Sequence, residues 1–212
     1  MSDFTDRLMK GLGELGIKAS AGQAESLERF AQLLLKWNKV YNLTAIRSPE
    51  EVLSHHLLDC AAIVPHLEAL CPGSASVLDV GSGGGLPSVP LAVLKPDWQI
   101  AAVDAVKKKT VFLTQAAITL KLRNFKAYHA RVETLSGNWD LITSRAFSCL
   151  ADFVRLTDNL LSAGGRWAAM KGAVPREEIA ALPQGVAVEK IIPLSVPGLC
   201  EERHLIVMRK LS

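Results

Sequence analysis

The sequence has few cysteines and no long apolar run. Its four cysteines, Cys60, Cys71, Cys149 and Cys200, are far apart and form no Cys-x-x-Cys pair. This spacing is not that of a disulfide framework or a zinc site, so we expect reduced thiols and no bound metal. No apolar stretch approaches the ~18–20 residues of a membrane span, and the N-terminal segment MSDFTDRLMK lacks the apolar part of a secretory signal. These absences predict a cytoplasmic protein that does not associate with membranes.

The composition is that of a folded globular chain. The 212 residues are 49% hydrophobic and 21% charged, which leaves ample material for a core and gives no sign of disorder. This length suits a single domain, or a domain with a small additional region. We expect the protein to be a monomer.

Positive charge is concentrated in the middle of the chain, although the net charge is only +3. Residues 71–150 contain nine Lys and Arg against five Asp and Glu, whereas the segments before and after them are close to balance. Lys107, Lys108 and Lys109 are consecutive. Such a run is typical of a solvated helix face or of a site for a phosphate-rich substrate, and the charge pattern alone leaves both open.

The first seventy residues predict helices. Ser20 and Gln23 fit a capping box, and apolar residues then recur at helical spacing up to Tyr41. Ser48-Pro49-Glu50-Glu51 marks a second helix start. The apolar stripe that follows contains Leu53, His56, Leu57, Cys60, Ala61, Val64 and Leu67. We interpret His56 on this stripe as a packed, hydrogen-bonded histidine rather than as a ligand.

After residue 73 the pattern changes to short strands that alternate with helices. The expected strands are 77–80, 99–103, 126–129, 139–143 and 166–170, and the expected helices between them include 110–122 and 150–161. This alternation is typical of βαβ units on a parallel sheet. Two further strands, 186–194 and 204–209, follow each other without a helix and can close the sheet as an antiparallel pair. The sequence thus predicts a helical region, residues 1–73, followed by an α/β domain, residues 74–212.

A glycine-rich loop, LDVGSGGGLPS (residues 78–88), follows the first predicted strand. The dinucleotide pattern G-x-G-x-x-G fails, because its third glycine position is Leu86 or Ser88, and a Walker loop fails because the next lysine is Lys95. What remains is Asp-x-Gly-x-Gly-x-Gly, from Asp79 to Gly85. A glycine turn between a strand and a helix places backbone N–H groups against a ligand, and this form suits an adenosyl group without a pyrophosphate.

Two later positions support an adenosyl ligand. Asp104 ends the next predicted strand, where a carboxylate can accept hydrogen bonds from both ribose hydroxyls. The alternative is that Asp104 caps the helix that follows it. Val132 and Glu133 come after the third strand, where an adenine edge meets a backbone N–H and an apolar side chain. Together these positions favour S-adenosylmethionine (SAM) over NAD.

Seven motifs extend this interpretation over most of the chain. They are KWNKVYNLTAIRSPEEVLSHHLLDC, LDVGSGGGLPSVPLA, VDAVKKKTVFL, ARVE, ITSRAF, MKG and ERHLIV. From about Gln32 to Val207, these motifs resemble the RsmG (GidB) family of bacterial 16S rRNA guanine-N7 methyltransferases. The resemblance implies a Rossmann-like, class I SAM-dependent methyltransferase fold preceded by helices, with residues 74–212 as the SAM-binding domain. It further implies that the protein methylates N7 of a guanine in the small-subunit rRNA.

The same resemblance implies which residues contact the cofactor. They are Gly81, Leu86, Val132, Glu133 and Arg145, with Asp104 as the ribose partner. Gly83, in the same glycine loop, is a further candidate for cofactor contact. The chain departs from the family pattern at two places. The family usually has Gly-Ile where this chain has Ser88-Val89, and it commonly has Arg where this chain has His55.

The residues after the fourth predicted strand constrain the reaction. Methyltransferases that act on exocyclic amines have Asp/Asn-Pro-Pro-aromatic there, whereas this chain has Ser144-Arg145-Ala146-Phe147. Methylation at a pyrimidine carbon needs a cysteine nucleophile, typically in a Pro-Cys pair, and this chain has only Cys71-Pro72 in the reverse order. Guanine N7 has a free in-plane lone pair at neutral pH. We therefore expect no catalytic base, because orientation alone can supply up to ~7–11 kcal/mol.

Guanine N7 also constrains how the base is held. The usual Arg contact to O6 and N7 would block the reacting atom, so the base must be held by its Watson–Crick edge and by stacking. Our candidates for contacts with rRNA are Lys107, Lys108, Lys109, Arg123, Lys171 and Arg203, and His204 lies beside the last of these. Lys171 is equally well explained as a surface charge, and Arg203 and His204 as structural residues. Arg145 could also bind phosphate or the guanine O6, although the resemblance favours the cofactor.

Three other functions share parts of this pattern. A small-molecule methyltransferase would have the same cofactor loop and would accept a soluble nucleophile. A protein that senses SAM while bound to RNA would transfer nothing. An NAD oxidoreductase is the weakest alternative, because the third glycine of its fingerprint is missing.

Overall fold

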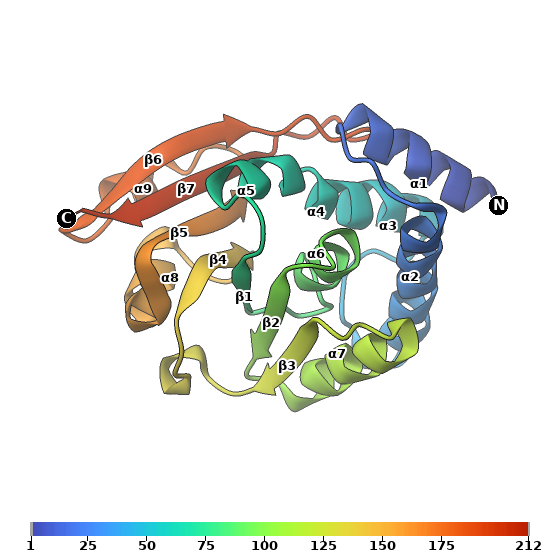
Figure 1. The fold of residues 1–212 in the computed structure, drawn as a ribbon, viewed down its shortest axis with the longest axis horizontal. Coiled ribbons are helices and arrows are strands. Elements are labelled where there is room, and N and C mark those ends of the chain that lie inside the picture. Colours follow the sequence, from blue (N-terminus) through green and yellow to red (C-terminus); the bar gives the residue numbers. More distant parts are fainter. Residues whose placement is uncertain (1, 212) are drawn as a thin grey trace.

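A seven-stranded sheet forms the centre of the structure, a computed structural model that describes residues 2–211 (Figure 1). The strands are β1 (Ser76–Val80), β2 (Gln99–Asp104), β3 (Phe125–His129), β4 (Trp139–Arg145), β5 (Leu161–Lys171), β6 (Val186–Pro193) and β7 (His204–Lys210). Their order in the sheet is β3-β2-β1-β4-β5-β7-β6. The pairs from β3 to β5 are parallel, whereas β7 is antiparallel to both β5 and β6. The predicted α/β fold, including the antiparallel end, is confirmed.

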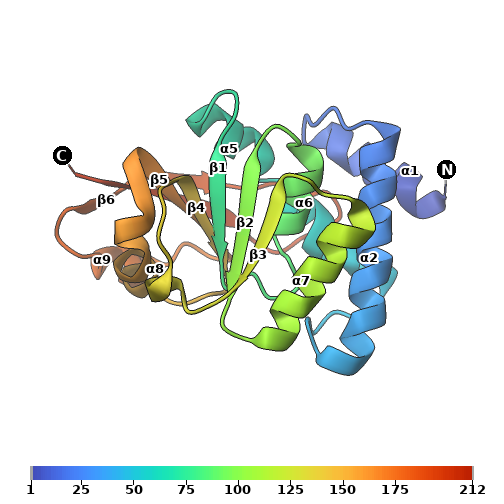
Figure 2. The ribbon, with the colours of Figure 1, turned by 60° about the horizontal axis from the view of Figure 1, so that its bottom comes forward.

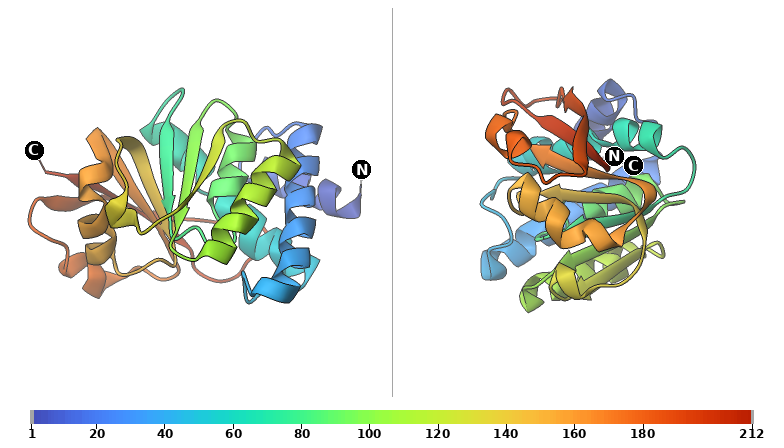
Figure 3. Two further views of the ribbon diagram at one scale, coloured as in Figure 1. Left: turned by 90° about the horizontal axis from the view of Figure 1, so that it is seen from below. Right: turned by 90° about the vertical axis from the view of Figure 1, so that its left-hand side faces the viewer.

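Helices cover both faces of the sheet (Figures 1, 2 and 3). They are α1 (Asp3–Glu14), α2 (Ala21–Tyr41), α3 (Pro49–Val52), η1 (Leu53–Leu58), α4 (Asp59–Ala61), α5 (Val64–Leu70), α6 (Ser88–Leu94), α7 (Lys107–Leu120), η2 (Val132–Thr134), α8 (Leu150–Thr157), η3 (Asp158–Leu160) and α9 (Arg176–Ala180). The helices up to α7 pack on one face, and η2, α8 and α9 pack on the other. Among residues 2–211, no helix combines the length and the apolar composition needed to cross a bilayer.

Because both faces are covered, the central strands are apolar on both sides. In β1, Val77 and Leu78 point to opposite faces, and both are fully buried in separate hydrophobic clusters. A parallel sheet between two helical layers needs such near-continuous apolar runs. This is why the strands are visible in the sequence as short blocks of Val, Ile, Leu and Ala.

The N-terminal helices share a hydrophobic core with the sheet and with α6 and α7. The predicted capping box at Ser20 and Gln23 is present, and Gln23 Nε2 also donates to the carbonyl of Val93 at the end of α6 (2.9 Å). Phe30 of α2 packs on Phe112 of α7, with ring centroids 6.3 Å apart. The boundary that we place after residue 73 lies in the segment between α5 and β1.

The predicted bounds of two helices were wrong. The helix expected at 110–122 begins at Lys107, after the N-cap residue Val106, whose backbone N–H donates to the carboxylate of Asp104 (2.8 Å). It ends at Leu120, because Lys121 is left-handed (φ 56°). The helix expected at 150–161 ends at Thr157, and β5 begins already at Leu161. The early start of β5 requires an irregular register opposite Trp139.

The helix predicted to begin at Ser48 is also interrupted, whereas its apolar stripe predicted one continuous helix. After α3, residues 53–58 form a π-helix, in which the N–H of Asp59 reaches back to the carbonyl of Ser54. A π-turn inserts one extra residue, so it rotates everything that follows relative to an α-helix. The residues of the predicted stripe are all buried, and so is Asp59, which lies off the stripe, because this segment is buried on all sides.

Candidate active site

The glycine loop lies at the carboxyl ends of β1 and β2. The N–H groups of Gly81 and Ser82 both donate to the carbonyl of Val103 in β2, at 2.9 and 3.2 Å. Gly81, Gly83 and Gly85 have φ angles of 68°, 55° and 79°, which L-residues with a side chain rarely adopt. The sequence therefore needs glycine at these positions to turn from β1 into α6.

A cavity of about 320 Å³, which we call the glycine-loop cavity, opens beside this loop. Its walls include Gly81, Asp104, Lys109, Val132, Glu133 and Phe147. Four residues that we assign to the cofactor, Gly81, Asp104, Val132 and Glu133, thus surround one cavity. A Cβ at position 81 would lie 2.7 Å from the ring of Phe147, so glycine keeps this wall open. The size is within the usual range for small-ligand sites.

Asp104 joins the glycine loop to α7. Its Oδ2 accepts from the N–H of Gly83 (3.0 Å), its Oδ1 accepts from the N–H of Val106, and Lys109 Nζ lies 3.6 Å from Oδ2. Asp104 thus binds the N–H of the N-cap residue and no N–H of the first turn of α7, so it does not cap the helix as in the alternative interpretation, and it lines the cavity. Each oxygen keeps a lone pair with which it can accept from a ribose hydroxyl.

Other loop residues lie behind the cavity. Leu86 is buried in the larger core cluster, and Gly83 contributes its N–H to Asp104. Asp79 is fully buried, and burial raises the pKa of its carboxyl to about 7 although its Oδ2 accepts from the N–H of Ser88 (3.2 Å). Within the described part of the chain, Asp79 Oδ1 and Ser88 Oγ form no hydrogen bond. The Ser88 departure thus places a hydroxyl in a buried site where the family usually has glycine.

Arg145 extends into a second cavity, of about 360 Å³, which we call the arginine cavity. It lies among His55, His56, Asp59, Arg145, Lys171, Arg203 and His204. Three predicted contact residues, Arg145, Lys171 and Arg203, are therefore brought together here rather than at the glycine loop. The two cavities share one wall residue, Ala146, which has a φ of 60°. They are adjacent at the end of β4.

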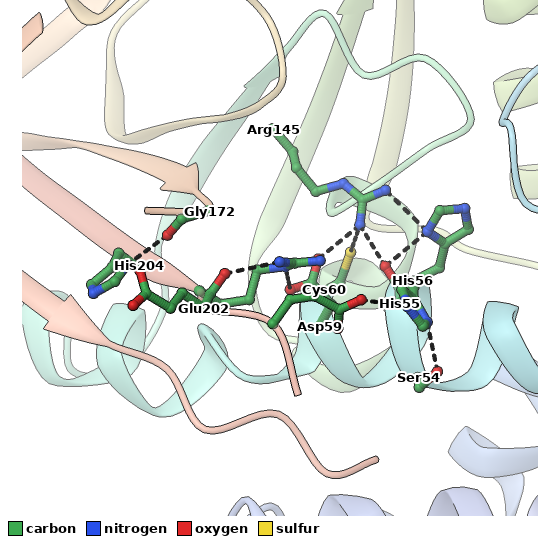
Figure 4. A network of polar contacts seen from close by, with 11 residues as sticks. Ser54, His55, His56, Asp59, Cys60, Arg145, Gly172, Glu202 and His204 are labelled. Atoms are coloured by element: carbon green, nitrogen blue, oxygen red, sulfur yellow. Dashed lines mark hydrogen bonds and ion pairs between the residues drawn. The ribbon is translucent and has the colours of Figure 1, made fainter. Parts of the chain in front are cut away.

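A buried carboxylate joins the two arginines of this cavity (Figure 4). Arg145 Nη1 donates to Asp59 Oδ2 at 2.9 Å, and Arg203 Nε lies 3.2 Å from Asp59 Oδ1. The side chains of Arg145 and Arg203 remain 22% and 24% exposed, whereas that of Asp59 is 4% exposed. The carboxylate thus orients two partly exposed guanidinium groups, whose other N–H donors can bind an anion or a carbonyl oxygen.

His56 is neutral in this network. Burial, reinforced by the nearby charge of Arg145, lowers its pKa to about 4. Nη2 of Arg145 lies 3.0 Å from His56 Nδ1, and Nε2 lies 2.7 Å from Thr44 Oγ1. Nδ1 also lies 2.9 Å from the carbonyl oxygen of His55, so a donor and an acceptor both face this nitrogen. This agrees with our interpretation of His56 as a packed histidine. Its neighbour His55 lies 3.6 Å from Glu201 Oε1.

Lys171 is tied to the segment after β4. Its Nζ donates to Glu178 Oε2 (2.8 Å) and to the carbonyl of Ser148 (3.2 Å), and Glu178 Oε2 accepts from the N–H of Leu150 (2.7 Å). These bonds link β5 and α9 to the segment that contains Phe147, which lines the glycine-loop cavity.

The remaining predicted RNA contacts lie on or near α7. Lys107 and Lys108 are exposed in its first turn, and Lys109 lines the glycine-loop cavity. Arg123 is exposed beyond the other end of α7, beside Lys126 of the edge strand β3. The structure thus places the lysine run and Arg123 at opposite ends of one helix.

Asp59 and Phe147 were not predicted from the sequence. Asp59 lies off the apolar stripe, although the neighbouring pair His55-His56 is a hint of a polar cluster. Phe147 follows Ala146, whose left-handed backbone has no signal in the sequence. In the structure its ring lines the glycine-loop cavity and approaches Gly81 closely.

The chain is similar to known proteins over nearly its whole length. The family described as rRNA small subunit methyltransferase G matches residues 23–206. Proteins named ribosomal RNA small subunit methyltransferase G are 49% identical in Chromobacterium violaceum (98% of this chain and 99% of the relative) and 51% identical in Laribacter hongkongensis (96% and 97%).

Solved structures share the fold at low identity. Magnesium protoporphyrin IX methyltransferase from Synechocystis, with bound SAM, has a TM-score of 0.61 at 12% identity and covers 86% of this chain and 97% of its own. TrmN from Thermus thermophilus has a TM-score of 0.56 at 23% identity over 75% of this chain and 53% of its own. The fold is therefore that of SAM-dependent methyltransferases, and the chain belongs to the rRNA small subunit methyltransferase G family.

Proposed function

We propose that this protein transfers a methyl group from SAM to N7 of one guanine in the 16S rRNA of the small ribosomal subunit. Two kinds of observation support this. The relatives of similar length are named for small-subunit rRNA methylation. In the structure, the glycine-loop cavity adjoins a cavity rich in cations, and the two meet at Ala146. This adjacency is the observation that favours a phosphate-rich acceptor next to the methyl donor.

The residues of the glycine-loop cavity fit SAM. Gly81 leaves open the space that a Cβ would fill, the Asp104 oxygens keep acceptor positions for ribose hydroxyls, and Val132 offers a buried apolar surface at the far wall. We assign Gly81, Asp104, Val132 and Glu133 to direct contact, and Gly83 and Leu86 to shaping the loop. When bound, SAM supplies an electrophilic methyl group. We propose no metal for this reaction.

No residue of the site has to remove a proton. The N7 lone pair of guanine is free at neutral pH, so the task of the protein is to hold the base in line and to exclude water. Arg145 and Arg203 offer partly exposed donors that Asp59 orients toward a carbonyl oxygen or a phosphate. In this proposal Arg145 therefore contacts the RNA that accepts the methyl group, and it lies next to the cofactor cavity rather than in its wall.

The partner and its location follow from this function. A single-stranded or flipped-out guanine can enter the arginine cavity, whereas N7 of a base within an A-form RNA helix faces a deep, narrow major groove that side chains cannot reach. Lys107, Lys108, Lys109 and Arg123 are the proposed contacts with more distant phosphates. We infer that the protein acts as a monomer in the cytoplasm, where ribosomal subunits are assembled.

The direct test uses methyl-labelled SAM and small subunits that lack N7-methylguanosine. We expect label at N7 of a single guanine, found by mapping the rRNA, and no label with the Arg145→Met variant even though that variant still binds SAM. Arg155→Met removes an exposed arginine outside the site and serves as the control. Binding of SAM without label on subunits or on naked rRNA would contradict the proposal and would favour a small-molecule methyltransferase or a SAM sensor.

A further inference from the structure

A row of aromatic rings extends from the core to the surface at the end of α2. Phe112 is fully buried and lies 5.5 Å, centroid to centroid, from Trp37. Trp37 in turn stacks on Tyr41 at 5.1 Å with an interplanar angle of 30°. Tyr41 is 37% exposed and lies in the last turn of α2. The row therefore ends in an aromatic ring that the solvent reaches.

The end of α2 lies beside the beginning of α7. The two helices run antiparallel, since Trp37 meets Phe112 while Arg29 Nη2 donates to the carbonyl of Thr119 (3.0 Å). Figure 2 shows them side by side, with the last turns of α2 and the first turns of α7 at the same end of the molecule. The last turns of α2 and the first turn of α7 contain four exposed lysines: Lys36, Lys39, Lys107 and Lys108.

The two chain segments that form this surface contain cationic and apolar residues but no acidic residue. Residues 29–49 and residues 105–132 contain no Asp or Glu. Several of the most exposed large apolar side chains of the described chain are in the same turns, namely Val40 (71% exposed), Val106 (40%) and Val111 (47%). Lysine and exposed aromatic side chains are what single-stranded nucleic acid needs, because phosphates bind the cations and bases stack on the rings.

We infer that Tyr41 and the four lysines, which we call the α2–α7 surface, bind an unpaired RNA segment that flanks the methylated guanine, with one base stacked on Tyr41. The inference rests on the proposed function and names a second RNA site for it. A protein partner fits less well, because lysine is depleted in protein–protein interfaces. The proposal commits to the rRNA.

The surface is rigidly connected to the arginine cavity. Buried Asn38 donates from Nδ2 to the carbonyl of Ile46 (3.0 Å) and accepts at Oδ1 from the N–H of Thr44 (2.9 Å), which fixes the turn after α2. Ile46 lines the arginine cavity, and Thr44 holds His56 at its wall. An RNA strand can therefore lie along this short turn with one base at Tyr41 and the target guanine in the cavity.

The first experiment removes the charge. We compare K36Q/K39Q/K107Q/K108Q with a matched control, K10Q/K18Q/R176Q/K190Q, which removes four exposed charges from other parts of the surface. Binding to unmethylated small subunits is measured as a function of salt. The α2–α7 variant should lower the slope of log K against log salt by about 3, since each lost phosphate contact changes it by about 0.7–0.9. An equal slope in both variants would overturn the proposal.

The second experiment tests stacking. We expect Tyr41→Ala to weaken binding to the subunit by about 10-fold or more, because a base stacked on an aromatic ring contributes that much. Tyr41→Phe keeps the ring and should bind like the unmodified protein. Equal affinity of Tyr41→Ala and Tyr41→Phe would contradict the stacking. Thermal unfolding of both variants shows whether the aromatic row itself remains packed.

The third experiment identifies the partner. A photoreactive benzoyl-phenylalanine at position 41 should crosslink to rRNA within the small subunit, whereas a crosslink to a ribosomal protein would overturn the proposal. A methylation assay with the unmodified protein shows whether a negative result concerns the proposed function or only the α2–α7 surface. If it labels no RNA, the proposed function fails. If it labels the guanine while the surface variants behave like their controls, only this inference fails.

Discussion

Nη1 of Arg145 donates to Oδ2 of Asp59 at 2.9 Å, and this bond connects the end of β4 to the helical segment that follows the π-helix. Arg203, just before β7, approaches the other oxygen of the same carboxylate. Three segments that are far apart in the sequence thus meet at one buried charge. Asp59 therefore holds in place the two arginines that line the arginine cavity.

We predict that Asp59→Asn strongly destabilises the protein, because two partly buried guanidinium groups lose their counter-charge. Removing one partner of a buried pair typically costs about 3–5 kcal/mol. Arg145→Met combined with Asp59→Asn should cost less than the sum of the two single changes, by at least about 1 kcal/mol in a double-mutant cycle from urea unfolding. The same cycle on the exposed pair Arg155–Asp152 should show little coupling. Additive effects at Asp59 and Arg145 would contradict the geometry.

His56 should make stability depend on pH in the acid range. Its pKa is about 4 in the folded protein against 6.5 in the unfolded chain, so the unfolded chain binds the extra proton between these values. The contribution of neutral His56 to the free energy of unfolding is therefore fully present above pH 6.5. It falls by about 3 kcal/mol as the pH is lowered toward 4. The free energy of unfolding relative to His56→Asn should show this change. Asp79, whose raised pKa acts in the opposite direction, is present in both proteins and cancels. A difference that does not vary with pH would contradict the neutral assignment.

Gly81→Ala should reduce SAM binding more than it reduces stability. The alanine would have to adopt the left-handed backbone of Gly81, and its Cβ would collide with the Phe147 ring at the wall of the glycine-loop cavity. Gly16→Ala is a matched control, since Gly16 has a similar φ of 75° with open space around it. Both variants should lose about 1 kcal/mol of stability from backbone strain. By isothermal titration, only Gly81→Ala should bind SAM at least about tenfold more weakly, and equal binding by the two variants would remove Gly81 from the site.

Substitution of Lys171 tests whether this residue has a structural or an RNA-binding role. Because its ammonium group links Glu178 to the carbonyl of Ser148, Lys171→Met should loosen the segment around Phe147 and weaken SAM binding, with a loss of about 1–2 kcal/mol of stability. Lys190→Met, at an exposed position of β6, is the control. If Lys171→Met instead leaves stability and SAM affinity unchanged and lowers the salt slope of subunit binding, Lys171 is an RNA contact.

Much of the fold follows from local patterns in the sequence. The strands are short apolar runs because both faces of the sheet are covered, and such runs are visible without any tertiary information. The capping box at Ser20 and Gln23 is also local, since its bonds join neighbouring residues, and the glycines of the turn after β1 are required by their own backbone angles. The cofactor loop and the α/β class could therefore be predicted.

Other features exist only in the tertiary structure. Asp59 is buried although it lies off the apolar stripe, and it is stabilised by Arg145 and Arg203 from the other half of the chain. Tyr41 and Lys107 belong to one surface only because α2 packs antiparallel on α7. The amino-acid sequence by itself thus determined the strands, the caps and the glycine loop, whose energetics are local. Folding alone decided which charges are buried and which distant side chains share a cavity, because burial and pairing depend on contacts between segments far apart in the chain.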